Sequence, residues 1–343
     1  MENDKKVYRT LALYDELIRG HVVNKSEWAE EHGVNERSVR RYLQEIQYFL
    51  DEENGRNGRN YVIRNDRHAG GFRIAAKDDD FLTEGELFAI CKILIESRAF
   101  KKEILESIVN RMLHGLISDQ GNKRIHDYVA GELFSYLDPK HHTPDLKTLW
   151  KLAKAIREHR ILEISYHKIG MKTPVKRRIR PVGIVFSEYY FYVMAILDSP
   201  QGEEYFQKSG PTSYRVDRIG RVTETDEQFK IPYSQRFKEG DFKNRVQFMY
   251  GGAVQNISFM YYGRSLEAVL DRLPTARAEE KEGGWLVHAE AMGDEGILMW
   301  LLSQGSKVEI LSPVTLLEKW RGEIGAMAKR AEEKRPGVPE AST

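Results

Sequence analysis

The sequence predicts an α+β fold arranged in four consecutive segments. Residues 1–76 combine helical periodicity with a short alternating pair of strands, and residues 145–232 form a block rich in Ile, Val, Tyr and Phe. In residues 245–333, strand and helix patterns alternate, whereas the apolar stripes of residues 81–142 repeat at helical spacing. The length of 343 residues exceeds that of an ordinary single domain, which agrees with several domains.

The N-terminal segment predicts three short helices closed by a hairpin. Asn24 and Asn35 are typical N-cap residues, and each precedes a helical pattern. The apolar stripe of the third helix is Val39, Leu43, Ile46 and Leu50. Around Tyr61 and Phe72, apolar residues alternate with polar ones, as in two half-buried strands. Three helices followed by a hairpin are typical of a winged helix-turn-helix domain.

The opposite face of the third helix carries side chains suited to DNA. At about 100° per residue, Arg37, Arg41 and Gln44 project away from the apolar stripe. Their forked donors suit guanine, adenine and phosphate, and the hairpin adds further cations for the DNA backbone or minor groove. The predicted DNA-contacting residues are Asn35, Arg37, Ser38, Arg40, Arg41, Gln44, Arg64, Arg67 and His68. A solvated amphipathic helix with ordinary surface arginines is the alternative that the spacing leaves open.

A family resemblance adds to this interpretation. Residues 34–43, Val-Asn-Glu-Arg-Ser-Val-Arg-Arg-Tyr-Leu, resemble the recognition helix of DeoR-like and WYL-domain regulators, in which a Val-Ser-x-Arg-Thr-Ile-Arg-Arg-Asp run occupies this place. Gly70-Gly71-Phe72 resembles their wing, where Gly-Gly-Tyr is usual. The departures are Asn35 for Ser and Tyr42 for Asp, and they bear on the base sequence that is read rather than on the fold.

The β-rich segment resembles a second known module. Strands are expected near residues 161–167, 178–186, 189–197, 203–208, 213–218 and 220–224, and a linker near residues 233–244. The motifs are Ile164-Ser165-Tyr166-His167, Arg180-Pro181-Val182-Gly183, Phe191-Tyr192-Val193-Met194-Ala195 and Tyr214-Arg215-Val216-Asp217-Arg218-Ile219. Their order and spacing resemble the WYL domain, a small Sm-like β-barrel. The Trp-Tyr-Leu triplet that gives this domain its name falls on residues 191–193, Phe-Tyr-Val, where two of the three letters have changed.

This second resemblance implies a sensor rather than a catalyst. WYL regulators are similar to one-component regulators whose barrel binds a nucleotide or nucleic-acid-like effector. By resemblance, the effector-binding positions are Tyr166, His167, Arg180, Tyr192, Arg215 and Arg218.

The residues themselves agree in part. Lysines and arginines crowd residues 168–180, and tyrosines lie between the cations, so the rings could stack bases while the cations neutralise phosphates. The alternative is that the cations face solvent and the tyrosines belong to the core. We interpret Asp217, which lies between Arg215 and Arg218, as a structural ion-pair partner.

Composition and missing motifs exclude several function classes. The 53 basic and 52 acidic residues nearly cancel, so global charge neither favours nor excludes a nucleic-acid partner. The single cysteine, Cys91, cannot form an intramolecular disulfide, and no apolar run is long enough to cross a bilayer, so we expect a cytoplasmic protein without a membrane partner. No nucleophile elbow, Walker A loop, dinucleotide fingerprint or His-Glu-x-x-His motif is present. We therefore expect no enzymatic activity, cofactor or metal.

The C-terminal segment completes the prediction. Its order of strand, helix, strand, strand, helix and strand is that of a ferredoxin-like βαββαβ unit. The leading hypothesis is a homodimeric repressor that binds an inverted repeat in a double-stranded DNA operator and responds to a nucleotide or single-stranded nucleic-acid effector. We expect residues 84–136 and the C-terminal unit to hold the dimer.

Two other function classes compete with this hypothesis. In one, the chain is a nucleic-acid-processing accessory protein that binds single strands through its barrel. In the other, it is an interaction adaptor whose winged helix contacts protein.

Overall fold

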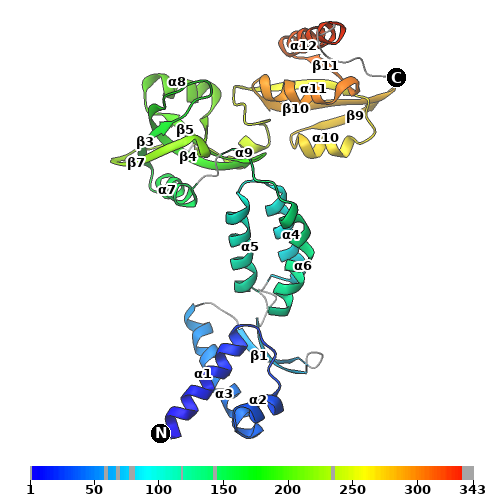
Figure 1. The fold of residues 1–343 in the computed structure, drawn as a ribbon. Helices are drawn as coiled ribbons and strands as arrows, with labels where there is room; N and C mark the ends of the chain where they lie inside the picture. Colours follow the sequence, from blue (N-terminus) through cyan, green and yellow to red (C-terminus); the bar gives the residue numbers. More distant parts are fainter. Residues whose placement is uncertain are drawn as a thin grey trace. The chain divides into compact units, whose positions relative to one another are not determined.

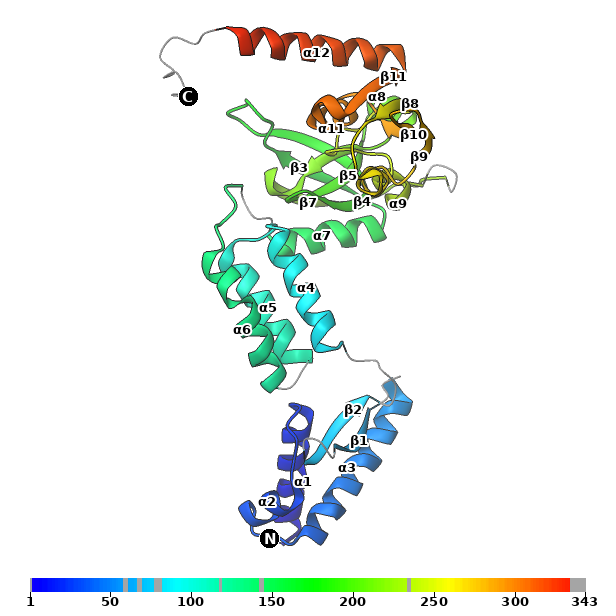
Figure 2. The same ribbon diagram turned by 90° about the vertical axis from the view of Figure 1, so that its right-hand side faces the viewer.

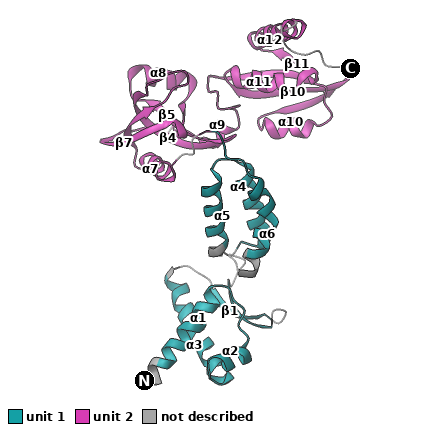
Figure 3. Ribbon diagram, in the orientation of Figure 1, with its two compact units in different colours: residues 1–140 teal, residues 141–343 magenta. Residues whose placement is uncertain are grey.

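The computed structural model describes residues 2–57, 61–66, 70–76, 82–116, 119–141, 145–232 and 236–333. The chain divides into two compact units, residues 1–140 and 141–343 (Figure 3). Helices and several antiparallel sheets are both present, which confirms the α+β class. The four predicted segments subdivide these units more finely, and that subdivision stays a prediction. No described helix combines the length and the apolar character that a membrane span requires.

The N-terminal part of the first unit consists of three helices and a hairpin (Figures 1 and 2). The elements are α1 (Glu2–Ile18), α2 (Lys25–Glu31), α3 (Glu36–Asn57), β1 (Tyr61–Asp66) and β2 (Gly71–Ala76). Asn24 caps α2 by accepting hydrogen bonds from the backbone amides of Ser26 and Glu27. Asn35 accepts from the Ser38 amide at 2.8 Å. The whole predicted stripe of α3 is buried, and it packs with Leu13, Leu17 and Trp28.

The hairpin is held against the connection between α1 and α2. Val23 and Phe72 exchange two backbone hydrogen bonds of 2.8 Å. A Cβ at position 71 would lie 2.5 Å from the carbonyl oxygen of Val23, so this close approach requires Gly71. Backbone contact thereby explains Gly71 and Phe72 of the Gly-Gly-Phe motif, and Gly70 adopts a positive φ of 75°.

Three further helices complete the first unit: α4 (Glu84–Glu96), α5 (Lys102–Leu116) and α6 (Asp119–Ser135). Thr83 and Glu86 form a reciprocal capping box at the start of α4. Cys91 is fully buried on this helix, and burial raises the pKa of its thiol. The thiol therefore stays protonated, as is usual for a structural core cysteine.

The second unit begins with a five-stranded antiparallel sheet in the order β6-β5-β4-β3-β7. Its elements are α7 (Leu146–Arg157), β3 (Arg160–Tyr166), β4 (Val175–Ser187), β5 (Tyr190–Leu197), α8 (Pro200–Ser209), β6 (Thr212–Arg215), the 3₁₀ turn η1 (Val216–Arg218) and β7 (Ile219–Gln228). Helix α7 packs against β3 and β4, with Leu152 and Ala155 in the core (Figure 2). Strands β6 and β7 are linked through η1 but do not pair with each other. Hydrogen bonds therefore do not close this sheet, and the Sm-like barrel stays a prediction.

Two predictions for this region are wrong. The expected strand at residues 203–208 is helix α8, because the Ser199 side chain caps it, Pro200 occupies its first turn and Gly210 ends it at φ 77°. The expected linker at residues 233–244 contains a short helix, α9 (Glu239–Lys243). Its Phe242 is buried in a cluster with Val185 and Met194 of the sheet.

The C-terminal part follows the predicted order of strands and helices. Its elements are β8 (Val254–Tyr261), α10 (Leu266–Arg272), β9 (Arg277–Lys281), β10 (Gly284–Met292), α11 (Glu295–Ser303), the 3₁₀ turn η3 (Gly305–Lys307), β11 (Val308–Ser312) and α12 (Val314–Glu332). The strand order is β11-β8-β10-β9, with every pair antiparallel. Phe259 and Ile297 are fully buried between the sheet and its helices, and Trp300 packs against Phe259.

Replacing two glycines of the second unit by alanine should change its stability in opposite directions. A Cβ at Gly202 would lie 2.0 Å from the carbonyl oxygen of Leu197, whereas one at Gly322 would meet nothing within 4 Å. We expect Gly202→Ala to destabilise the unit by more than about 1 kcal/mol through overpacking against backbone. Gly322→Ala should stabilise it by about 0.5–1 kcal/mol, since alanine favours the helix interior. Thermal melting of both variants measures this, and equal shifts would contradict the packing of α8.

Candidate nucleic-acid and effector sites

The first candidate site is the exposed face of α3. Arg37, Arg40, Arg41 and Gln44 are exposed, and Val39 is buried on the opposite face. Among the residues that the structure describes, none of these three arginines takes part in an ion pair. Arg41 lies 5.8 Å from the ring centroid of Tyr42, and a cationic surface without carboxylate partners is available to an external anion.

The hairpin places two arginines side by side. Arg64 of β1 lies directly opposite Arg73 of β2, and directly paired residues share one face of a ladder. Arg73 also pairs with Asp66 at 3.2 Å. Sequence reasoning missed Arg73, because only the strand register shows that it accompanies Arg64. The predicted contacts Arg67 and His68 lie outside the described residues.

The second candidate site lies on the five-stranded sheet, where Tyr192 and Arg215 are paired across β5 and β6. The guanidinium carbon of Arg215 lies 3.4 Å from the ring centroid of Tyr190. Arg215 also donates to both carboxylate oxygens of Asp217, from Nε at 3.0 Å and from Nη2 at 2.7 Å. The two side chains are only 16% and 6% exposed. Asp217 is thus the ion-pair partner that its position in the sequence indicates.

Burial also changes the chemistry of the neighbouring tyrosine. It raises the pKa of Tyr192 to about 12, although the charge of Arg215 acts in the opposite direction. The phenol therefore remains a neutral hydrogen-bond donor near neutral pH.

Arg180 stands apart from this group. Its guanidinium pairs with Glu203 of α8 at 2.6 Å and with Asp198 at 3.5 Å. Two carboxylates therefore compensate its charge, and an anionic effector would have to compete with them.

The remaining predicted effector residues lie near the end of β3. The Tyr166 ring packs edge-on against Tyr214, with centroids 5.1 Å apart, and its hydroxyl accepts from the Arg215 amide at 3.4 Å. The exposed His167 is tied to Arg218 through a backbone hydrogen bond of 3.0 Å. Tyr166, His167, Arg215 and Arg218 are thus connected, and Arg180 is engaged separately with α8.

The register of three neighbouring strands also forms a basic row that the prediction did not include. Ser165 of β3 pairs with Lys176 of β4 on one side and with Arg221 of β7 on the other. All three side chains share one face of the sheet. Within the described ranges, neither Lys176 nor Arg221 takes part in an ion pair. Only the strand pairing reveals this row, since its members are far apart in sequence.

Comparison with known protein families identifies two domains in the second unit. Residues 147–224 match the family described as "WYL domain", and residues 253–328 match the family described as "WCX domain". The chain carries a WYL domain and a WCX domain. The WYL domain spans α7 to β7, and the WCX domain covers most of the region from β8 to α12. The resemblance to a WYL domain is thereby confirmed over residues 147–224.

Two solved structures resemble this chain at low sequence identity. No curated protein matches the chain. One similar solved structure is "Proteasome accessory factor B/C (PafBC) of Arthrobacter aurescens", at 15% identity and a TM-score of 0.28, over 98% of this chain and 49% of that one. Another is "Crystal structure of a CRISPR Cas-related protein", at 16% identity and a TM-score of 0.35, over 75% of this chain and 76% of that one. The chain therefore spans about half the length of the first structure.

Proposed function

We propose that the protein is a DNA-binding transcription regulator, in which residues 1–76 form a winged helix-turn-helix domain and the WYL domain responds to an anionic effector. The observation that carries this proposal is the exposed face of α3. The exposed face of α3 carries Arg37, Arg40 and Arg41, and the apolar stripe on the opposite side of the helix is buried. A recognition helix needs this division, since one face must fix its orientation while the other enters the major groove.

The proposed effector is a nucleotide or a short single strand. Lys176, Arg218 and Arg221 supply cations for its phosphates, and Tyr190 or Tyr192 supply rings for its bases. A phosphate that reached Arg215 would replace part of its bond to Asp217, which would loosen the connection between β6 and β7. The effector changes DNA affinity only if it binds one arrangement of the protein more tightly than the other.

Selection from a random duplex library tests the DNA-binding function. The proposed homodimer should enrich an inverted repeat with half-sites about 10 base pairs apart or a multiple of that distance. The full chain is used, and a protein carrying Arg40→Ala and Arg41→Ala serves as the negative control. If the unaltered protein enriches no duplex sequence, the proposed DNA-binding function is wrong.

A second function is supported by the row of Lys176, Ser165 and Arg221. A basic row on a sheet that also carries tyrosines suits non-specific binding of single strands. In that case the protein is a nucleic-acid-processing accessory protein, and single-strand affinity should not depend on base sequence. Enrichment of single strands without a motif, and of no duplex, would favour this alternative.

A further inference from the structure

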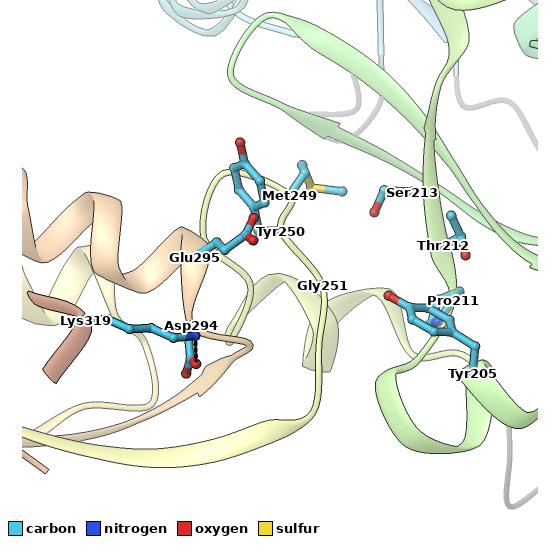
Figure 4. Close-up of a pocket in the computed structure, with 10 residues that line it drawn as sticks. All are labelled: Tyr205, Pro211, Thr212, Ser213, Met249, Tyr250, Gly251, Asp294, Glu295 and Lys319. Carbon is cyan, nitrogen blue, oxygen red and sulfur yellow. Dashed lines mark hydrogen bonds and ion pairs between the residues drawn. The ribbon is translucent and has the colours of Figure 1, made fainter. Parts of the chain in front are cut away.

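A pocket of about 460 Å³ lies where the WYL domain meets the WCX domain (Figure 4). One wall comes from α8 and β6 and contributes Tyr205, Pro211, Thr212 and Ser213. The other wall comes from the segment at residues 249–251, the start of α11 and Lys319 of α12. The volume is within the range of small-molecule sites, about 300–1,000 Å³.

The pocket is separate from the proposed effector positions. None of the six predicted effector residues lines it. Thr212 and Ser213 begin strand β6, and the predicted effector residue Arg215 ends it. A ligand in the pocket would therefore contact β6 at its other end.

One charged pair in the pocket is already satisfied internally. The Asp294 carboxylate accepts from Lys319 Nζ at 2.6 Å and from Gln255 Nε2 at 2.6 Å. These bonds hold the pKa of Asp294 below its ordinary value, so the carboxylate remains charged and compensates Lys319. This pair gives the pocket no net charge.

Glu295 supplies the remaining charge. Its side chain is exposed at the first position of α11, and no ion pair to it exists within the described part of the chain. In Figure 4 it lies beside Tyr250, with Tyr205 on the other side of the pocket. The residues Tyr205 and Tyr250 are 47% and 42% exposed. A carboxylate beside exposed aromatic faces attracts a cation and disfavours a phosphate or carboxylate ligand.

We propose that this junction pocket binds a small organic cation, with its ammonium or guanidinium group at Glu295 and its carbon chain against Tyr205 and Tyr250. The hydroxyl of Ser213, which extends into the pocket in Figure 4, accepts a hydrogen bond at the opposite wall. Because the two walls belong to two domains, the bound cation holds the WYL and WCX domains together.

Three probes with the same five-carbon chain test this assignment: 5-aminopentan-1-ol, pentane-1,5-diol and glutarate. Methyl-labelled methionine provides the readout, because Met249 lines the pocket and the chain has only nine methionines. The Met249 signal is assigned by Met249→Leu. We expect the amine to shift this signal saturably in the full-length protein, and the diol and glutarate to leave it in place.

Two pairs of variants make the test specific. Glu295→Gln should weaken amine binding about fivefold or more, since hydrogen bonds to a charged acceptor are about twice as strong as neutral ones. Glu323→Gln, an exposed glutamate of α12 outside the pocket, should have no effect. Tyr250→Leu should weaken binding, whereas Tyr250→Phe retains the aromatic face and the affinity.

Unchanged signals from the other methionines show that each variant is folded. Equal binding of the three probes, or full affinity in Glu295→Gln, would overturn the proposal.

Discussion

Replacing Arg40 and Arg41 by alanine is expected to weaken duplex DNA binding roughly 100-fold or more, since the loss of each base contact costs about 1–3 kcal/mol. Both side chains are exposed, so their loss leaves the core of α3 intact. The double variant should also show a shallower dependence of affinity on salt, because fewer counterions are released. Fluorescence anisotropy with the selected duplex at several salt concentrations measures both effects.

A matched control separates specific contacts from loss of charge. Arg19→Ala with Arg111→Ala removes two exposed arginines from the same unit, and neither lies on α3. This control should bind the duplex nearly as well as the unaltered protein. If the control and the α3 variant lose the same affinity, the assignment of the recognition face is wrong.

Removing the charge of Asp217 is expected to give the largest stability loss among the ion pairs described above. Asp217→Asn leaves the guanidinium of Arg215 without a carboxylate, and both side chains are largely buried. Breaking a buried pair costs about 3–5 kcal/mol, which corresponds to a fall in melting temperature of roughly 6 °C or more for a unit of this size. Calorimetry of the full chain follows the transition of the second unit.

The control for this prediction is a more exposed pair in the same sheet. Glu227 contacts Arg178, and its side chain is 61% exposed. Glu227→Gln should change stability by less than about 1 kcal/mol, because solvent screens the interaction and Arg178 retains Asp198. An unchanged melting temperature in Asp217→Asn would show that Arg215 does not depend on this partner.

Local signals account for the parts of the fold that the sequence predicted. The caps at Asn24 and Asn35 depend on residues no more than three positions away. The buried stripe of α3 follows from helical spacing alone. The pairing of Arg215 with Asp217 is equally local, since only one residue separates them.

Interactions between distant segments account for what the sequence did not predict. Tyr205 and Phe206 resemble strand residues, and the capping signal of Ser199 and Pro200 outweighs them. Without α8 in place, Glu203 could not be identified as the partner of Arg180. The junction pocket combines residues from position 205 to position 319, so no periodic pattern marks it.

A competition titration shows whether the protein recognises a specific duplex. The full chain is bound to its selected duplex at physiological salt, and random duplex and a short single strand are added as competitors. We expect the selected duplex to bind at least about 1,000-fold more tightly than random duplex, as is typical of sequence-specific regulators. We also expect the single strand to change this affinity as an effector. Equal affinity for the selected and the random duplex would show that the protein does not recognise a specific duplex.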